Sequence, residues 1–356
     1  MRFNLYAIYG LSDGVTDEQF DLSKLPFDIT EGARIEAISE RFRDGAFDLW
    51  KEGIGTIAWE NLKRVRYGLV HRYDPNPTED EKTGKLIFGT EAHEHSEMLI
   101  RGLDACLRLV RPMRQSAFLI HGDIRDDGSF DVRGFDTPPP DFVEVTEVQK
   151  LFLLRNQDTD DLRTYAPEFL RAMRGDFWKY RMAVHFHQLG YFQSLEWKAR
   201  YLLWCAAIES IYTSHNRGHQ GKWVATSRIR WFLGENTSIY APGDISHLPC
   251  DPGLTVGQIV QDLYEMRNFI AHGDKIPDSF FTEIVRDGFG GGVQKSEVLF
   301  EAASFIIRAS LLRILRDGLL NDFADAGSAD AYFRARNLTW PVLKAAQRAA
   351  SAGGAP

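Results

Sequence analysis

The sequence has little cysteine, and the cysteines it has lack the spacing that cysteine chemistry usually requires. Only Cys106, Cys205 and Cys250 occur among 356 residues, and no two of them form a Cys-x-x-Cys pair. This excludes a disulfide scaffold and a zinc ribbon, and it fits a reducing compartment. We therefore expect a cytoplasmic protein, and nothing in the sequence predicts a cofactor.

Long apolar runs and an excess of positive charge are also missing. No stretch of about 18 uninterrupted apolar residues occurs, so we expect no membrane partner. The opening MRFNLYAIYG has no basic region followed by an apolar run, and it reads as a strand rather than a signal peptide. The formal net charge of -8 argues against a protein that coats nucleic acid non-specifically. A local basic surface for RNA remains compatible with that charge.

The chain is too long for one ordinary core, and its predicted secondary structure changes from mixed to helical near the middle. Residues 1–140 predict a mixed α/β domain, whose ligand the sequence does not identify. Strands are predicted at FNLYAIYG, ARIEAI and VRYGLVHRY, a helix at SEMLIRGLDACLRLVRPM, and a hairpin at AFLIHGDI and SFDVRGFD. Pro138, Pro139 and Pro140 cannot continue a ladder or a helix, so we place the domain boundary there. Residues 141–164 then form a linker.

From residue 165 the pattern becomes helical. Helices are predicted over residues 194–214, 255–272 and 296–323, the first with Ser194 as its N-cap and a crowded apolar circumference. For the second, Thr255 is a suitable N-cap and Gly273 a suitable stop. The fold class predicted is therefore α+β with two domains. An N-terminal mixed α/β domain precedes an all-α bundle over residues 165–345, and a mobile tail over 346–356 follows.

The helix over residues 255–272 ends in a group of residues with chemical potential. Asn268 and His272 are four residues apart and share a face, and Arg267 lies about 140° away from His272 on an ideal helix. The long side chain of Arg267 can nevertheless reach the same cleft. An imidazole can move protons, and a guanidinium can hold a phosphate and its developing charge. In RNA the 2′-hydroxyl can be the nucleophile, so this set suits metal-free phosphodiester cleavage.

The spacing of Arg and His alone is not specific, because it occurs at four other places in this chain. The context is more informative. The string Arg-Asn-Phe-Ile-Ala-His-Gly ends an amphipathic helix, and Ala-Ala-Ile-Glu-Ser-Ile-Tyr lies roughly fifty residues upstream in a crowded helix. With these features, residues 165–325 resemble the HEPN superfamily, and specifically its Apea-like branch.

The resemblance implies a bundle of four to five helices that pairs with a second copy, so that two motifs meet in one composite cleft. Catalytic members are metal-independent endoribonucleases, often with toxin or anti-phage roles. By position, Arg267 and His272 match the catalytic pair, and Asn268 matches the polar residue that commonly follows the arginine. Glu209 matches an acidic residue of the earlier helix, which either orients Arg267 or holds the bundle. RNA and a second copy are thus the expected partners.

Other readings stay open. Arg217, Lys222, Arg228 and Arg230 are interleaved with two tryptophans, which suits phosphates and stacked bases but equally a solvated loop that leads into a helix. Some HEPN domains bind nucleotides or proteins, or dimerise without catalysis. A third hypothesis, a metal hydrolase, requires His93 and His95 to converge with Glu97 or Asp123. His185 and His187 lie in a helical context and should point to opposite sides.

Overall fold

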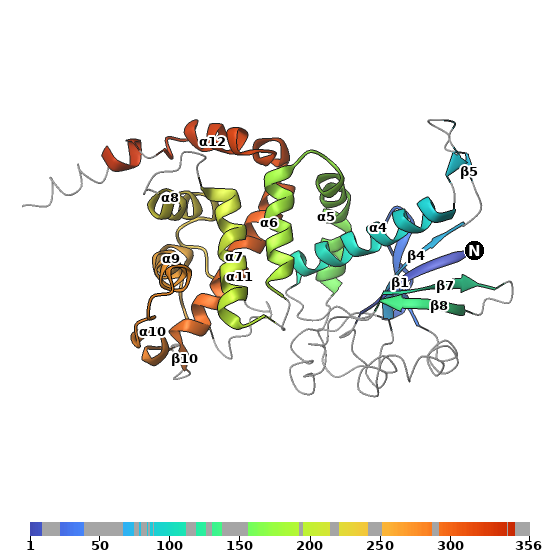
Figure 1. The fold of residues 1–356 in the computed structure, drawn as a ribbon, viewed down its shortest axis with the longest axis horizontal. Coiled ribbons are helices and arrows are strands. Elements are labelled where there is room, and N and C mark those ends of the chain that lie inside the picture. The colour runs from blue at the N-terminus through green and yellow to red at the C-terminus, as the bar shows by residue number, and fades with distance from the viewer. Residues whose placement is uncertain are drawn as a thin grey trace, which may run out of the picture. The chain divides into compact units, whose positions relative to one another are not determined.

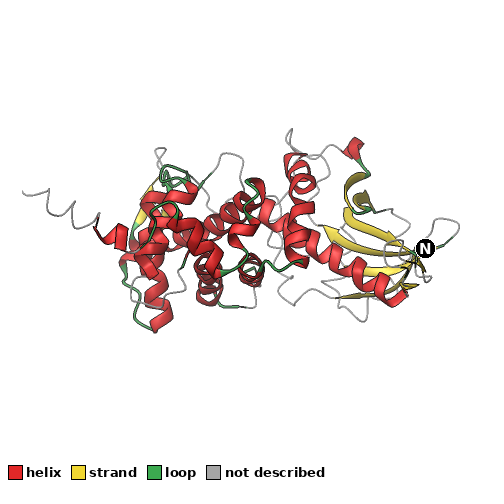
Figure 2. Cartoon of the chain, turned by 90° about the horizontal axis from the view of Figure 1, so that it is seen from above, coloured by secondary structure: helices red, strands yellow, loops and turns green. Residues whose placement is uncertain are grey.

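The computed structural model describes residues 1–8, 22–38, 67–74, 78–79, 84, 86–87, 89–111, 119–125, 130–136, 156–191, 195–213, 221–240, 251–286, 292–339 and 341–345. By its internal contacts the chain divides into two compact units, Met1–Arg171 and Ala172–Pro356. The first unit combines a sheet with helices, and the second is mostly helical (Figures 1 and 2). Among the described helices, none is both long enough and apolar enough to cross a membrane.

The first unit is built on a six-stranded sheet in the order β2-β3-β4-β1-β7-β8, with every neighbouring pair antiparallel. The strands are β1 (Arg2–Ile8), β2 (Phe27–Thr30), β3 (Ala33–Ala37), β4 (Tyr67–Tyr73), β7 (Leu119–Ile124) and β8 (Phe130–Asp136). A 3₁₀ turn (Leu22–Lys24) precedes β2, and β5 (Thr78–Glu79) pairs with β6 (Leu86–Ile87). The strands predicted at these places and the β7–β8 hairpin are confirmed.

Helix α4 (Gly89–Val110) packs against β1 and β4, and it is the helix predicted there. Its apolar stripe is fully buried at Leu99, Leu103 and Leu107, so the hydrophobic effect holds it on the sheet. Helix α5 (Asn156–Arg174) spans the division between the two units. The linker predicted over residues 141–164 is therefore wrong for its second part, because residues 156–164 are helical. Its first part lies outside the described residues.

The second unit is mostly helical. Its elements are α6 (Trp178–Leu189), α7 (Trp197–Tyr212), α8 (Gly221–Leu233), α9 (Val256–His272), α10 (Ser279–Thr282), β9 (Ile284–Arg286), β10 (Gly292–Gln294), α11 (Lys295–Arg316), η5 (Leu320–Phe323) and α12 (Ala326–Arg334). Helices α7 and α11 each pack against α6, α8 and α9 and against one another, which makes them the centre of the unit. The pairing of β9 with β10 departs from the all-α expectation.

Two details of the predicted helices change. Residues 296–323 are not one helix: α11 ends at Arg316, and Gly318 adopts a left-handed φ of +66° before the 3₁₀ turn η5. Glycine tolerates that conformation and so permits the break. The N-cap of α7 is Glu196, whose carboxylate accepts from the Lys198 amide at 2.9 Å, while Ser194 lies outside the described residues.

Candidate functional site

Local sequence fixes both ends of α9, the helix that carries the motif. At its start Thr255 and Gln258 form a capping box, with the Thr255 amide donating to the Gln258 side chain at 2.9 Å. At its end Gly273 is left-handed, with φ of +72°, and the Asp274 amide returns to the Phe269 carbonyl at 2.9 Å. His272 is therefore the last helical residue, as predicted.

Arg267 is held by a carboxylate from the neighbouring helix α7. Its Nη2 lies 2.9 Å from Oε1 and 3.0 Å from Oε2 of Glu209, and its Nη1 donates to the Asn268 side-chain oxygen at 3.3 Å. The side chains of Arg267 and Glu209 are each 27% exposed. The guanidinium is thus oriented by Glu209 and Asn268 while part of it still faces solvent. The structure brings these three predicted residues together.

His272 stands apart from that group. Its side chain is exposed, and it makes no hydrogen bond or ion pair with any residue that the structure describes. The imidazole is therefore accessible on the surface of the unit. The Arg267–Glu209 pair does not include it.

Three buried side chains, Tyr201, Cys205 and Tyr264, lie near Arg267 and Glu209. The Tyr201 hydroxyl donates to the Leu263 carbonyl at 2.7 Å, which joins α7 to α9. Burial, reinforced by the nearby Glu209 carboxylate, raises the pKa of the Cys205 thiol. The thiol therefore stays protonated and is no nucleophile. Tyr264 is buried as well, and burial raises the pKa of its phenol.

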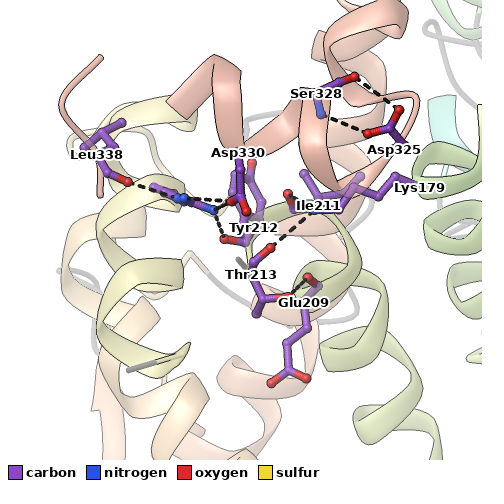
Figure 3. A network of polar contacts seen from close by, with 10 residues as sticks. Lys179, Glu209, Ile211, Tyr212, Thr213, Asp325, Ser328, Asp330 and Leu338 are labelled. Atoms are coloured by element: carbon purple, nitrogen blue, oxygen red, sulfur yellow. Dashed lines mark hydrogen bonds and ion pairs between the residues drawn. The ribbon is translucent and has the colours of Figure 1, made fainter. Parts of the chain in front are cut away.

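The C-terminal end of α7, which carries Glu209, is held by two buried cations (Figure 3). Lys179 of α6 donates to the carbonyls of Ile211 at 3.2 Å and Thr213 at 3.3 Å. Arg228 of α8 donates to the Tyr212 carbonyl at 3.0 Å. Cations at this position satisfy carbonyls that have no partner inside the helix and complement the helix dipole.

The two cations share an acidic neighbour on α12. Asp330 accepts from both terminal nitrogens of Arg228 at 3.1 Å. Burial lowers the pKa of Lys179 to about 8, a shift that Asp330 and Asp325 oppose and Arg228 reinforces. Sequence reasoning missed Lys179 and Asp330. No spacing signal links residues so far apart in the chain, and only the packing of α6, α7, α8 and α12 brings them together.

Most of the cations that were predicted to form a basic surface make contacts with other residues of the second unit. Arg228 is 2% exposed and bound to Asp330, so its assignment to RNA contact is wrong. Arg230 donates to the Gly257 carbonyl at 2.9 Å, and Lys222 pairs with Glu265 at 3.0 Å, so both tie α8 to α9. Arg217 lies outside the described residues. The described cations of this segment therefore hold α8 against its neighbours.

The histidines of the first unit take separate partners. His93 Nδ1 lies 2.6 Å from the Tyr73 hydroxyl and His93 Nε2 lies 3.8 Å from Glu97, whereas His95 Nε2 lies 3.9 Å from Glu31. Among the described residues no group of three histidine, cysteine or acidic side chains is placed to hold a metal ion. The convergence that the metal-hydrolase hypothesis requires is not found there. In α6, His187 is buried and His185 exposed, as expected for opposite sides of a helix.

We compared the chain with family models, with curated proteins and with solved structures, and none of the three comparisons gives a match. The resemblance to the HEPN superfamily therefore depends on the residues and the helix pattern described above.

Proposed function

We propose that this protein is a metal-independent endoribonuclease of the HEPN type. The observation that carries the proposal is the end of α9, where an anchored, half-buried Arg267 and an exposed His272 lie within six residues. In this mechanism His272 takes the proton of the RNA 2′-hydroxyl, whose oxygen attacks the adjacent phosphorus. The bond to the 5′-oxygen breaks, and that oxygen receives a proton. Arg267 binds the phosphate and its developing charge, and Asn268 keeps the guanidinium in place.

A second copy of the chain completes the proposed site. Cleavage uses one group that accepts a proton and one that donates a proton, and one protomer offers a single imidazole in its motif. Two motifs facing each other in a homodimer would supply both groups. A ribonuclease of this kind acts as a toxin or anti-phage effector if it cleaves the RNA of its own host cell.

A non-catalytic module that binds a nucleotide or a protein is the second candidate. The observation that favours it is the ion pair itself, because Glu209 already compensates the charge of Arg267. A site that only binds would tolerate the loss of His272, which lies outside this pair. A catalytic site would not.

The deciding experiment is cleavage of total cellular RNA and tRNA by purified protein in EDTA. We expect the wild type to cleave, and we expect His272→Ala and Arg267→Ala each to lose about 100-fold or more of the rate. This is the usual contribution of a positioned proton-transfer group and of a group that stabilises developing negative charge, respectively. The matched controls are His185→Ala and Arg334→Ala, which change exposed residues of the same unit and should leave the rate unchanged. Cleavage that persists in His272→Ala at the wild-type rate would exclude this mechanism.

A further inference from the structure

The hydroxyl of Tyr264 is a buried donor without an acceptor. The residue is 2% exposed, and its hydroxyl makes no hydrogen bond within the part of the chain that the structure describes. An unpaired polar group in an interior is costly, and phenylalanine would fill the same space without that cost. Tyr201 offers a direct contrast, because it is equally buried but its hydroxyl is paired with the Leu263 carbonyl.

Tyr264 lies between the two polar links that join α7 and α9. One link is the hydrogen bond from Tyr201 to Leu263, the preceding residue, and the other is the ion pair of Glu209 with Arg267. Residues three apart on a helix share a face, so Tyr264 stands one turn below Arg267 on the side that faces α7. After burial, the Glu209 carboxylate is the largest cause of the raised pKa of this phenol, and Arg267 opposes it. The hydroxyl thus lies in the field of the ion pair.

We propose that Tyr264 is a positioning residue that donates to Glu209 when Arg267 turns from that carboxylate to the phosphate of bound RNA. The inference rests on the proposed function. Nη2 of Arg267 contacts both oxygens of Glu209, so a full contact with a phosphate weakens this pair. A half-buried carboxylate that loses its cation needs another donor, and the unpaired hydroxyl of the nearby Tyr264 supplies one.

A double-mutant cycle tests the hydrogen bond without any RNA. In the wild-type background, Tyr264→Phe should leave the melting temperature unchanged or raise it, because it removes an unpaired hydroxyl. In an Arg267→Ala background, where Glu209 has lost its cation, the same change should raise the unfolding equilibrium constant about fivefold, the usual worth of one hydrogen bond. Arg267→Met, which keeps an apolar stem, serves if the alanine variant does not fold.

The control for the cycle is Tyr201→Phe, which loses its bond to Leu263 in either background and should cost the same in both. Equal effects of Tyr264→Phe in the two backgrounds would overturn the proposal, because Tyr264 would then be uncoupled from the ion pair.

A second measurement links the hydroxyl to RNA. Binding of a short single-stranded RNA is measured on His272→Ala protein, which cannot cleave it under the proposed mechanism. We expect Tyr264→Phe to weaken this binding about fivefold, and the further change Glu209→Gln to remove most of that difference. Normal binding by Tyr264→Phe would refute the inference and leave the ribonuclease intact. If the wild type neither binds nor cleaves RNA, the proposed function fails, and coupling in the cycle then shows only that the two side chains interact.

Discussion

At the scale of single residues, Glu209 has two separable roles, which one substitution can distinguish. It neutralises Arg267 and it fixes the direction of the guanidinium. Both side chains are partly exposed, and ion pairs of that kind contribute about 0–1 kcal/mol to folding. The carboxylate therefore matters more for where Arg267 points than for whether α7 and α9 pack.

We predict that Glu209→Gln lowers the free energy of unfolding by no more than about 1 kcal/mol. The same change should lower RNA cleavage at least about tenfold, because a misplaced guanidinium contributes less to stabilising the phosphate. Denaturant unfolding and initial cleavage rates measured on the same preparation check both halves. The control is Glu265→Gln, which breaks the pair between Glu265 of α9 and Lys222 of α8 and should leave cleavage unchanged. A large loss of stability with normal cleavage would assign Glu209 to the bundle alone.

At the scale of elements, buried Lys179 holds the C-terminal end of α7. Its contribution to the free energy of unfolding changes with pH in a direction that its pKa determines. The folded pKa of Lys179 is about 8, below the 10.5 of a free lysine, because burial penalises the charged form. The folded protein therefore binds fewer protons than the unfolded chain between these two values. Stability from this group must rise with pH across that window.

We predict that between pH 8 and 9.5 the wild type gains about 1–2 kcal/mol in the free energy of unfolding relative to Lys179→Met, since one pKa unit corresponds to about 1.4 kcal/mol. The comparison is needed because burial raises the pKa of the Cys106 and Cys205 thiols, which act in the opposite direction in this window and equally in both proteins. The raised phenol pKa of Tyr201 and Tyr264 acts in that direction as well above pH 10. Urea unfolding at several pH values measures the difference, and Lys275→Met, which changes an exposed lysine, should follow the wild type. Parallel profiles for the wild type and Lys179→Met would contradict the shift.

Periodicity and capping residues predicted the elements well where these signals are local. Thr255 and Gly273 bound α9, and the Gly-containing stop after Arg316 shows the same chemistry, although the sequence reading extended that helix to residue 323. The assignment of Arg228 to RNA contact failed for a physical reason. The local sequence, an arginine close to tryptophans, is the same whether the arginine side chain faces solvent or caps the end of a helix. The distinction depends on Asp330, about a hundred residues away, and on the packing of α12.

The packing of α4 on the sheet of the first unit gives a pH dependence of the same sign at lower pH. His71 of β4 lies 2.8 Å from the Ser96 hydroxyl of α4, and its neighbours in register are Asn4 and Ala33. Burial lowers the pKa of His71, and the nearby His95 lowers it further, while Glu31 opposes both. The folded unit therefore resists a proton that the unfolded chain accepts near pH 6.5. Stability is lost as pH falls below that value toward the folded pKa.

We predict that amide hydrogen exchange in peptides of β4 and α4 is faster at pH 5.5 than at pH 7, after correction for the intrinsic effect of pH on exchange. Replacement of the histidine in His71→Gln should remove the difference, because the titrating group is gone. The exposed His185 lies in the second unit, and His185→Gln should leave the effect in place. Equal protection at the two pH values in the wild type would show that His71 does not control this interface.

At the scale of the whole molecule, charge limits how RNA can bind. The chain carries 42 basic and 50 acidic side chains, and three of the cations expected at an RNA surface are tied to protein partners. Each contact between a cation and a phosphate releases counterions, so the binding constant falls as salt rises. For single strands, each contact adds about -0.7 to the slope of log K against log salt. A protein with few free cations at its site must therefore depend weakly on salt.

We predict a slope of about -1 to -2 for log K against log salt, measured with a short single-stranded RNA on His272→Ala protein. In that background Arg267→Ala should make the slope shallower by the amount that one phosphate contact contributes, because it removes one phosphate-binding cation. Arg334→Ala should leave the slope unchanged, since α12 carries no part of the motif. A slope steeper than about -4 would require contact with a broad basic surface. Recognition would then depend on that surface rather than on the end of α9.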